Sequence, residues 1–214
     1  MFVSDWMTTK VLTVSPEASV SQAITLMKDK RIKHLPVVDE GRLRGVLSDS
    51  DLKYFVTSRC LQPGSGDIKD LINATPVRDI MSKTVSSTRP QAPVEEAAKT
   101  MHELKISCLP VVSDERVVGI ITRSDVYRAF VDITGIRYGG NRIFLSVEDR
   151  PGSIREVTDR VRKYGFRLQS ILTSYEGAAE GYRKLVVRTK GSGDIKGLRE
   201  ELERHHGDVV IQAD

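Results

Sequence analysis

The sequence predicts an α+β protein in two parts, the first of which contains the same structural unit twice. The apolar run Leu35–Val38 returns as Leu109–Val112, and each matched residue lies 74 positions before its counterpart. A constant offset that holds over about fifty positions indicates one unit repeated in tandem. After residue 141 the hydrophobic rhythm changes. This change predicts a separate unit at 142–214.

Each copy of the repeated unit carries the pattern of a β-α-β-β-α fold. Apolar residues at i, i+3, i+4 and i+7 from Val20 predict a half-buried helix with Ser19 as its N-cap. Two short apolar runs at 35–38 and 43–47 follow as strands, separated by a turn that Gly41 favours. A unit this small leaves its sheet half uncovered, so the two copies should pack on each other.

A second helix is expected after each pair of strands. Its inward residues should be Leu52, Phe55 and Val56 in the first copy and Val126, Phe130 and Val131 in the second. Between the copies, Gln62–Gly66 predicts a flexible loop and Asp67–Ile72 a helical turn. The second copy should begin after this turn.

Three motifs recur in the same order in both copies. They are Val77-Arg-Asp-Ile-Met81 with the looser Val3-Ser-Asp-Trp-Met7, the Leu-Pro-Val-Val runs, and a terminal Gly-x-x-Ser/Thr-x-x-Asp. Together they resemble the CBS domain, which occurs in tandem pairs called Bateman modules. The resemblance implies CBS repeats at 1–58 and 77–134, joined by a linker at 59–76.

After a glycine-containing linker at 135–141, the pattern of 142–214 predicts the order β-α-β-β-α-β, which is typical of a ferredoxin-like sandwich. Strands are expected at Ile143–Val147, 166–175, Leu185–Val187 and Val209–Ile211, with helices at 154–164 and 195–202. Because Asp149-Arg-Pro-Gly152 lies at the first strand-to-helix turn, this part resembles the ACT domain, a regulatory module that often binds amino acids. Gln169-Ser-Ile171 departs from the Asn-Ile that many ACT domains carry there.

Two CBS repeats followed by an ACT domain resemble the AcuB-type acetoin utilisation proteins of bacteria over the whole chain. This resemblance implies a regulator of acetoin or central carbon metabolism. Bateman modules and ACT domains both tend to pair, so it also implies a homodimer. Exposed sheet edges at Ile143–Val147 and Val209–Ile211 would favour such pairing.

Charge and cysteine content exclude several classes of protein. The net charge of +4 divides evenly, with 19 Lys and Arg against 17 Asp and Glu in residues 1–141 and 14 against 12 in residues 142–214. No basic block stands out, so nucleic acid is not expected as a partner. Cys60 and Cys108 match no metal spacing and are expected as reduced thiols. Without a signal peptide or a long apolar run, a cytoplasmic protein is expected.

The hydroxyl and carboxyl groups at the start of each second helix are the first candidates for binding. A carboxylate can accept hydrogen bonds from the two hydroxyls of a ribose, and a helix N-terminus favours phosphate. The pairs are Ser48 with Asp51 and Thr122 with Asp125. Ser/Thr-x-x-Asp can also be a capping box that only begins a helix. The resemblance favours contact with an adenine nucleotide (AMP, ADP or ATP), and the two roles are compatible.

The two helix starts differ in charge, which predicts unequal sites. Arg123 follows Thr122, where a cation is unfavourable unless an anion binds nearby. Asp49 stands at the matching position and would repel phosphate. Arg123 could serve its own repeat or the opposite one, or it could be a surface arginine.

The segments before the strands should border the adenine, as the resemblance implies. In the first repeat they contribute Lys33, His34 and Pro36, and in the second Cys108 and Pro110. Lys33 could reach phosphates. His34 could equally be a packing residue, and Cys108 at the equivalent position argues against catalysis by it.

In the last part, Asp149, Arg150 and Gly152 could hold a ligand's charged ends at a helix start, or they could form a tight turn without a ligand. No residues suggest catalysis or a metal site, and no cofactor is required. The sequence thus predicts a non-catalytic regulator that senses adenine nucleotides. The alternative is an amino-acid sensor in which the ACT part binds the ligand and the CBS pair is a scaffold.

Overall fold

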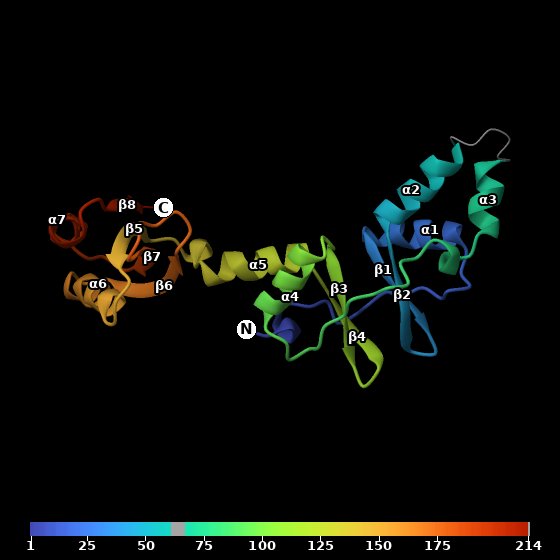
Figure 1. The fold of residues 1–214 in the computed structure, drawn as a ribbon, viewed down its shortest axis with the longest axis horizontal. Coiled ribbons are helices and arrows are strands. Elements are labelled where there is room, and N and C mark those ends of the chain that lie inside the picture. Colours follow the sequence, from blue (N-terminus) through green and yellow to red (C-terminus); the bar gives the residue numbers. More distant parts are fainter. Residues whose placement is uncertain (61–66, 214) are drawn as a thin grey trace. The chain divides into compact units, whose positions relative to one another are not determined.

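The computed structural model describes residues 1–60 and 67–213, which form two compact units at 1–127 and 128–214. The predicted loop Gln62–Gly66 lies outside the described residues. Figure 1 shows an α+β fold with helices and strands in both units. The elements of the first unit are η1 (Val3–Asp5), α1 (Val20–Lys30), β1 (His34–Asp39), β2 (Arg42–Ser48), α2 (Asp49–Cys60), α3 (Ile68–Ala74), η2 (Val77–Asp79), α4 (Val94–Glu103), β3 (Cys108–Ser113), β4 (Arg116–Thr122) and α5, which begins at Arg123 and ends at Ile133 in the second unit.

The two repeats share one four-stranded sheet with the order β1-β2-β4-β3. Each repeat contributes an antiparallel hairpin, and the hairpins meet where Arg42 of β2 pairs with Arg116 of β4. The predicted N-cap of α1 is confirmed, because Ser19 Oγ accepts from the Gln22 N–H at 3.2 Å. The predicted helical turn between the repeats is also confirmed and forms α3. The two copies therefore pack together as one module.

Each repeat is completed by a segment that precedes the other. The Val77 N–H donates to the Ala18 carbonyl at 2.8 Å, and the Val77 side chain lies in the core of the first repeat. In the same way, the Val3 N–H donates to the Ala92 carbonyl at 2.9 Å. Because each segment crosses to the opposite repeat, neither repeat is complete without the other.

Glycines in the inner strands permit this crossing. A Cβ added to Gly45 would lie 2.5 Å from Met81 Sδ and 2.9 Å from the Ser82 carbonyl oxygen. At Gly119 an added Cβ would meet the sulfur of Met7. Only glycine leaves room for the crossing methionines at these two positions.

Two details of the sequence-based prediction for the repeats are wrong. The first strand of each repeat is reduced to an isolated bridge, Val14 to Val37 and Thr88 to Val111. In the first repeat, Pro16 lacks the N–H that would extend the ladder beyond Val14. Phe130 was expected to face inward on α5 but is 59% exposed, whereas the smaller Ala129 is buried.

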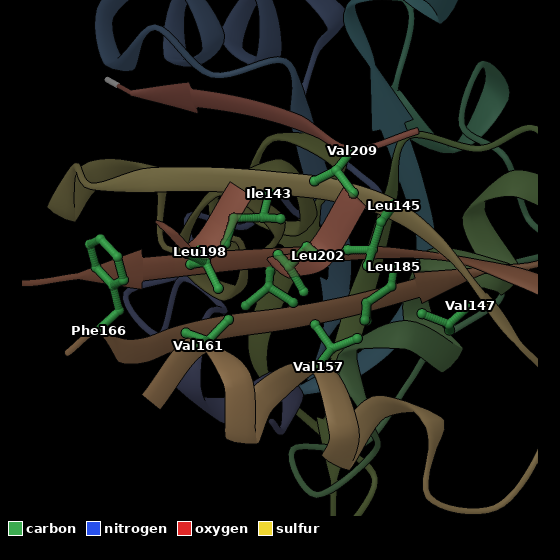
Figure 2. Packing of buried hydrophobic residues seen from close by; sticks show 11 residues of the cluster. Ile143, Leu145, Val147, Val157, Val161, Phe166, Leu185, Leu198, Leu202 and Val209 are labelled. Carbon is green, nitrogen blue, oxygen red and sulfur yellow. The ribbon is translucent and has the colours of Figure 1, made fainter. Parts of the chain in front are cut away.

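The second unit has the predicted order β-α-β-β-α-β, in a four-stranded antiparallel sheet ordered β6-β7-β5-β8. Its core lies between this sheet and the two helices, where apolar side chains meet around Leu198 and Leu202 (Figure 2). Its remaining elements are η3 (Ile136–Tyr138), β5 (Asn141–Glu148), α6 (Ser153–Lys163), β6 (Arg167–Ser174), β7 (Tyr182–Lys190), α7 (Ile195–His206) and β8 (Val210–Ala213).

One expectation about the edges of this second sheet is wrong. The strand that contains Ile143–Val147 is β5, and it is central, because it pairs with both β7 and β8. The edge strands are β6 and β8. The chain folds β8 back alongside β5, so the first strand in sequence becomes an inner strand in space.

Within the part of the chain that the structure describes, no helix is long and apolar enough to cross a membrane. Both cysteines are free thiols, with Cys60 exposed and Cys108 buried. No group of three or more His, Cys, Asp or Glu side chains among the described residues could hold a metal ion.

Candidate functional site

The predicted hydroxyl–carboxylate pairs form closely similar motifs at the starts of α2 and α5. Asp51 Oδ2 accepts from Ser48 Oγ at 2.6 Å and from the Ser48 N–H at 2.8 Å. Asp125 Oδ2 accepts from Thr122 Oγ1 at 2.7 Å and from the Thr122 N–H at 2.9 Å. Each carboxylate therefore fixes the hydroxyl that lies beside it at the helix start. In the first repeat the Asp51 N–H also donates to Ser48 Oγ at 3.2 Å, which completes the capping box that the alternative interpretation requires.

A pocket lies beside each of these motifs. The Asp51 pocket has a volume of about 300 Å³ and the Asp125 pocket about 380 Å³. The Asp51 pocket is lined by His34, Val46, Ser48, Ser50, Asp51, Ser82, Thr84, Val85, Ser86, Lys105, Ile106, Ser107 and Cys108. The Asp125 pocket is lined by Thr8, Lys10, Val11, Leu12, Arg31, Ile32, Lys33, His34, Ile120, Thr122, Ser124 and Asp125.

Both pockets combine the two repeats. The helix start of one repeat faces the segment before the first strand of the other, so Lys33 lines the pocket of Asp125 rather than that of Asp51. The crossing segments supply a further wall, where the Ser82 N–H donates to the Val46 carbonyl at 2.9 Å. A binding site made in this way exists only when the two repeats are folded together.

A turn after α1 and another after α4 position the residues at these walls. Arg31 and Lys105 adopt the left-handed conformation, with φ of 53° and 55°. This conformation ends the helix and redirects the chain into the strand. The start of α2 is tied to the same turn, because the Asp49 N–H donates to the Lys33 carbonyl at 3.0 Å. The Arg123 N–H makes the equivalent 3.0 Å bond to the Ser107 carbonyl.

His34 lines both pockets and links the repeats. Its Nε2 lies 2.6 Å from Ser107 Oγ. Burial lowers the pKa of His34 from its ordinary value, and the nearby carboxylates of Asp49 and Asp51 oppose this only in part. The imidazole is therefore mainly neutral near pH 7, and it can accept from or donate to the serine hydroxyl.

Cys108 and the two predicted prolines lie in different places. Cys108 lines the Asp51 pocket, and burial followed by the charge of Asp51 raises the pKa of its thiol to about 12. Pro36 and Pro110 are buried and line neither pocket. Their carbonyls accept from the N–H groups of Val14 and Thr88 at 3.1 and 3.0 Å, so they support the strands that carry the pockets.

Arg123 lies outside the pocket of its own repeat. Its Nε donates to the Ile106 carbonyl at 3.1 Å, and its side chain lines a separate hollow between α4 and α5. Asp49 lines the equivalent hollow in the first repeat and pairs with Lys53 at 3.0 Å. Arg123 and Asp49 were expected to make the two binding sites unequal. In the structure they line hollows that are separate from the Asp125 and Asp51 pockets.

Sequence reasoning missed several polar residues of the pockets. Lys10 and Thr84 come from the crossing segments, and Arg31 and Lys105 from the left-handed turns. The 74-residue offset relates each of these pairs, so the repeat itself contained the signal. The repeated sequence does not show, however, that the segments carrying Lys10 and Thr84 cross to the opposite repeat.

In the second unit, the side chains of the predicted ligand residues Asp149 and Arg150 contact neighbouring side chains. Arg150 donates to Glu148 at 2.6 Å and to the two carboxylate oxygens of Glu156 at 2.8 and 3.0 Å. Asp149 lies 3.6 Å from Arg183 Nε. Gly152 has a φ of 91° and immediately precedes α6, which fits the tight-turn interpretation. Arg150 also lines a hollow of about 280 Å³.

Comparison with known proteins assigns the first unit. The CBS domain family model matches residues 3–58 and 77–132. The chain belongs to the CBS-domain family. Its two CBS repeats form the tandem pair that the resemblance implied.

Two relatives by sequence show CBS pairs in different settings. The CBS domain-containing protein YhcV of Bacillus subtilis is 36% identical over 124 residues, which cover 58% of this chain and 81% of YhcV. A homoserine O-acetyltransferase of Methanohalobium evestigatum is 34% identical over 128 residues, which cover 59% of this chain but 24% of the enzyme. A CBS pair is therefore found both in small CBS proteins and as one part of a larger enzyme.

Three solved structures resemble the CBS pair. The pair of protein MJ0100, in complex with 5′-methylthioadenosine and S-adenosyl-L-methionine, has a TM-score of 0.53 and 29% identity, covering 62% of this chain and 97% of that one. CBSX2 in complex with AMP has 0.52 and 34%, covering 62% and 98%. A Vibrio cholerae protein described as an acetoin utilization protein (AcuB) has 0.55 and 32%, covering 64% and 97%. Two of these three CBS pairs, those of MJ0100 and CBSX2, hold adenosine derivatives in their structures.

Proposed function

We propose that this chain is a non-catalytic regulatory protein whose CBS pair senses adenine nucleotides. The observation that carries the proposal is the pair of equivalent pockets, each beside a hydroxyl–carboxylate motif at a helix start. Such a motif can hold a ribose while the helix N-terminus favours phosphate.

The capping geometry is compatible with ligand binding. In the first repeat, Asp51 Oδ2 accepts both bonds from Ser48, and these bonds leave Oδ1 to accept from a ribose hydroxyl. A carboxylate has about four lone-pair sites, so the two roles do not compete. The adenosine ligands of the CBSX2 and MJ0100 structures support the same class of ligand here.

The direct test is a titration of purified, nucleotide-free protein with AMP, ADP and ATP. Calorimetry should detect binding of micromolar to millimolar strength, and the melting temperature should rise with nucleotide because a ligand of the folded state stabilises it. If millimolar AMP, ADP and ATP produce neither heat nor a shift in melting temperature, the proposed function is wrong. Trp6 is the single tryptophan and lies in the first repeat, so its fluorescence offers a second readout.

We propose that residues 142–214 form an ACT-like domain that helps to assemble a cytoplasmic homodimer. The βαββαβ order and the Asp149–Gly152 turn support the assignment, and the edge strands β6 and β8 offer backbone groups for pairing. A chain that ends near Thr134 should then associate more weakly in analytical ultracentrifugation. Equal dimerisation constants for both lengths would remove this role. The boundaries 1–58, 77–134 and 142–214 belong to the same proposal.

The resemblance to AcuB proteins supports a place in acetoin or central carbon metabolism. In the alternative function, the ACT-like domain senses an amino acid and the CBS pair is a scaffold. The hollow beside Arg150, with Arg160 and His206 in its lining, is the observation that favours this alternative. Calorimetry with amino acids, run beside the nucleotide titration, separates the two functions by which ligand gives heat.

A further inference from the structure

The two pockets of the CBS pair are related position by position, which makes their differences directly comparable. The 74-residue offset relates Asp51 to Asp125, and it also relates the pairs Ser48 and Thr122, Ser82 and Thr8, Thr84 and Lys10, Lys105 and Arg31, and Ser107 and Lys33. Both pockets therefore have the same backbone framework and the same helix N-terminus. Differences in what they bind must come from the side chains that line them.

The charges of the two linings differ. The Asp125 pocket contains the cations Lys10, Arg31 and Lys33 against one carboxylate, which gives a formal charge of +2 with His34 neutral. The Asp51 pocket contains Lys105 as its one cation against one carboxylate, which gives zero. Of the two linings, that of the Asp125 pocket is thus the more favourable for an anion.

Lys33 lies close enough to Asp49 to help lower the pKa of that carboxyl, but none of the three cations of the Asp125 pocket is in a salt bridge among the described residues. The ion pairs among the described residues do not include Lys10, Arg31 or Lys33. All three residues are exposed, so their charged ends remain mobile enough to close on a ligand. Three cations on two segments of one pocket wall suit a phosphate group.

The Asp51 pocket is instead rich in hydroxyl groups. Six of its lining residues are serine or threonine, namely Ser48, Ser50, Ser82, Thr84, Ser86 and Ser107, against three in the Asp125 pocket. Hydroxyls both donate and accept, so they suit the uncharged polar groups of a nucleoside. They supply no net charge to offset a phosphate.

We propose that the two pockets take different adenosine ligands. The Asp125 pocket binds a phosphate-bearing adenine nucleotide, and the Asp51 pocket binds an uncharged adenosine nucleoside. This inference rests on the proposed function and adds which ligand class each pocket selects. It also moves the source of inequality from Arg123 and Asp49, which lie outside both pockets, to Lys10, Arg31 and Lys33.

AMP and adenosine are the matched probes, because they differ only in the phosphate. In calorimetric titrations of the full chain, Lys10→Thr combined with Lys33→Ser converts two cations to the residues of the other pocket. AMP affinity should fall at least tenfold, while adenosine affinity stays within twofold. Thr84→Lys adds a cation to the Asp51 pocket and should create a second AMP site per chain. Ser107 is left unchanged because it bonds to His34.

Salt dependence provides an independent readout. Raising the ionic strength should weaken AMP binding to the wild type and leave adenosine binding nearly unchanged, because salt screens the exposed cations. Melting temperatures verify that each variant is folded, and Thr84→Lys tests the idea without removing any side-chain contact of the Asp125 pocket.

The outcomes separate the inference from the proposed function. If neither AMP nor adenosine binds the wild type, the proposed function fails and the inference fails with it. If both bind but AMP affinity stays within twofold in the double variant, the inference alone is overturned. The same conclusion follows if Asp51→Ala, rather than Asp125→Ala, abolishes AMP binding.

Discussion

The two CBS repeats have similar residues in their cores and different residues around their pockets. Leu35 and Val37 are fully buried, as are their counterparts Leu109 and Val111. Around the pockets, Lys33 corresponds to Ser107 and His34 to Cys108. Close packing restricts the side chains of a core, whereas a solvated pocket wall tolerates changes of charge and polarity. One duplicated framework can therefore present two chemically different linings.

The largest expected effect comes from the two carboxylates. Asp125→Ala should weaken AMP binding by roughly 1.5–3 kcal/mol, the range for hydrogen bonds to charged groups, whereas Asp51→Ala should act on adenosine instead. Calorimetry of both variants measures this difference between the repeats. Asp39→Ala is the control, since Asp39 pairs with the exposed Arg44 and lines neither pocket. Unchanged ligand affinities in both variants would mean that the motifs act only as helix caps.

The next effect concerns the glycines that admit the crossing segments. Gly45→Ala should destabilise the fold by about 1–3 kcal/mol, the usual cost of overpacking. Gly119→Ala should cost less, because the added methyl meets the flexible Met7 side chain rather than a backbone carbonyl such as that of Ser82. Urea denaturation of the two variants measures the comparison. Equal losses would show that the two crossings are equally tight.

A smaller effect is the pH dependence of stability. It should differ between His34 and Cys108, which occupy the same position of the two repeats. Burial lowers the pKa of His34 below 6.5, so the folded state binds this proton less readily than the unfolded chain. Stability should therefore be full above pH 6.5 and fall as the pH drops below it. The cysteine thiol, whose pKa is raised to about 12, stays neutral throughout.

Urea midpoints at pH 7.5 and 5.5 test this difference. The decrease in the midpoint should be smaller in His34→Gln than in the wild type, and unchanged in Cys108→Ser. His206 in the second unit also has a lowered pKa through burial, so His206→Gln measures its separate share. A decrease in His34→Gln as large as in the wild type would exclude His34 as the cause.

The smallest effect is one of reactivity. At pH 8 the exposed Cys60 should react with a thiol reagent in a fast phase, and the buried, protonated Cys108 in a slow one. Cys60→Ser should abolish the fast phase. If both thiols of the wild type react equally fast, Cys108 in the wall of the Asp51 pocket is open to solvent.

Much of the fold follows from local patterns in the sequence. Periodicity and turn residues locate α1, the hairpin strands and the βαββαβ order of the second unit, because burial on one face leaves a regular spacing. The Ser19 cap and the Ser/Thr-x-x-Asp motifs are equally local, since their partners lie three residues away. The weak first strands were predicted wrongly, because one bridge at Val14 depends on a distant partner.

The membership of each pocket was decided by the tertiary structure alone. The sequence supplies the repeat, its offset and the carboxylates, but it does not show that Lys33 faces Asp125 or that Met81 crosses to Gly45. It also places Arg123 next to Thr122 in the chain, whereas the helix start directs its side chain to a separate hollow. Contacts between segments far apart in the sequence depend on how the two repeats pack, and packing of this kind leaves no periodic trace in the sequence.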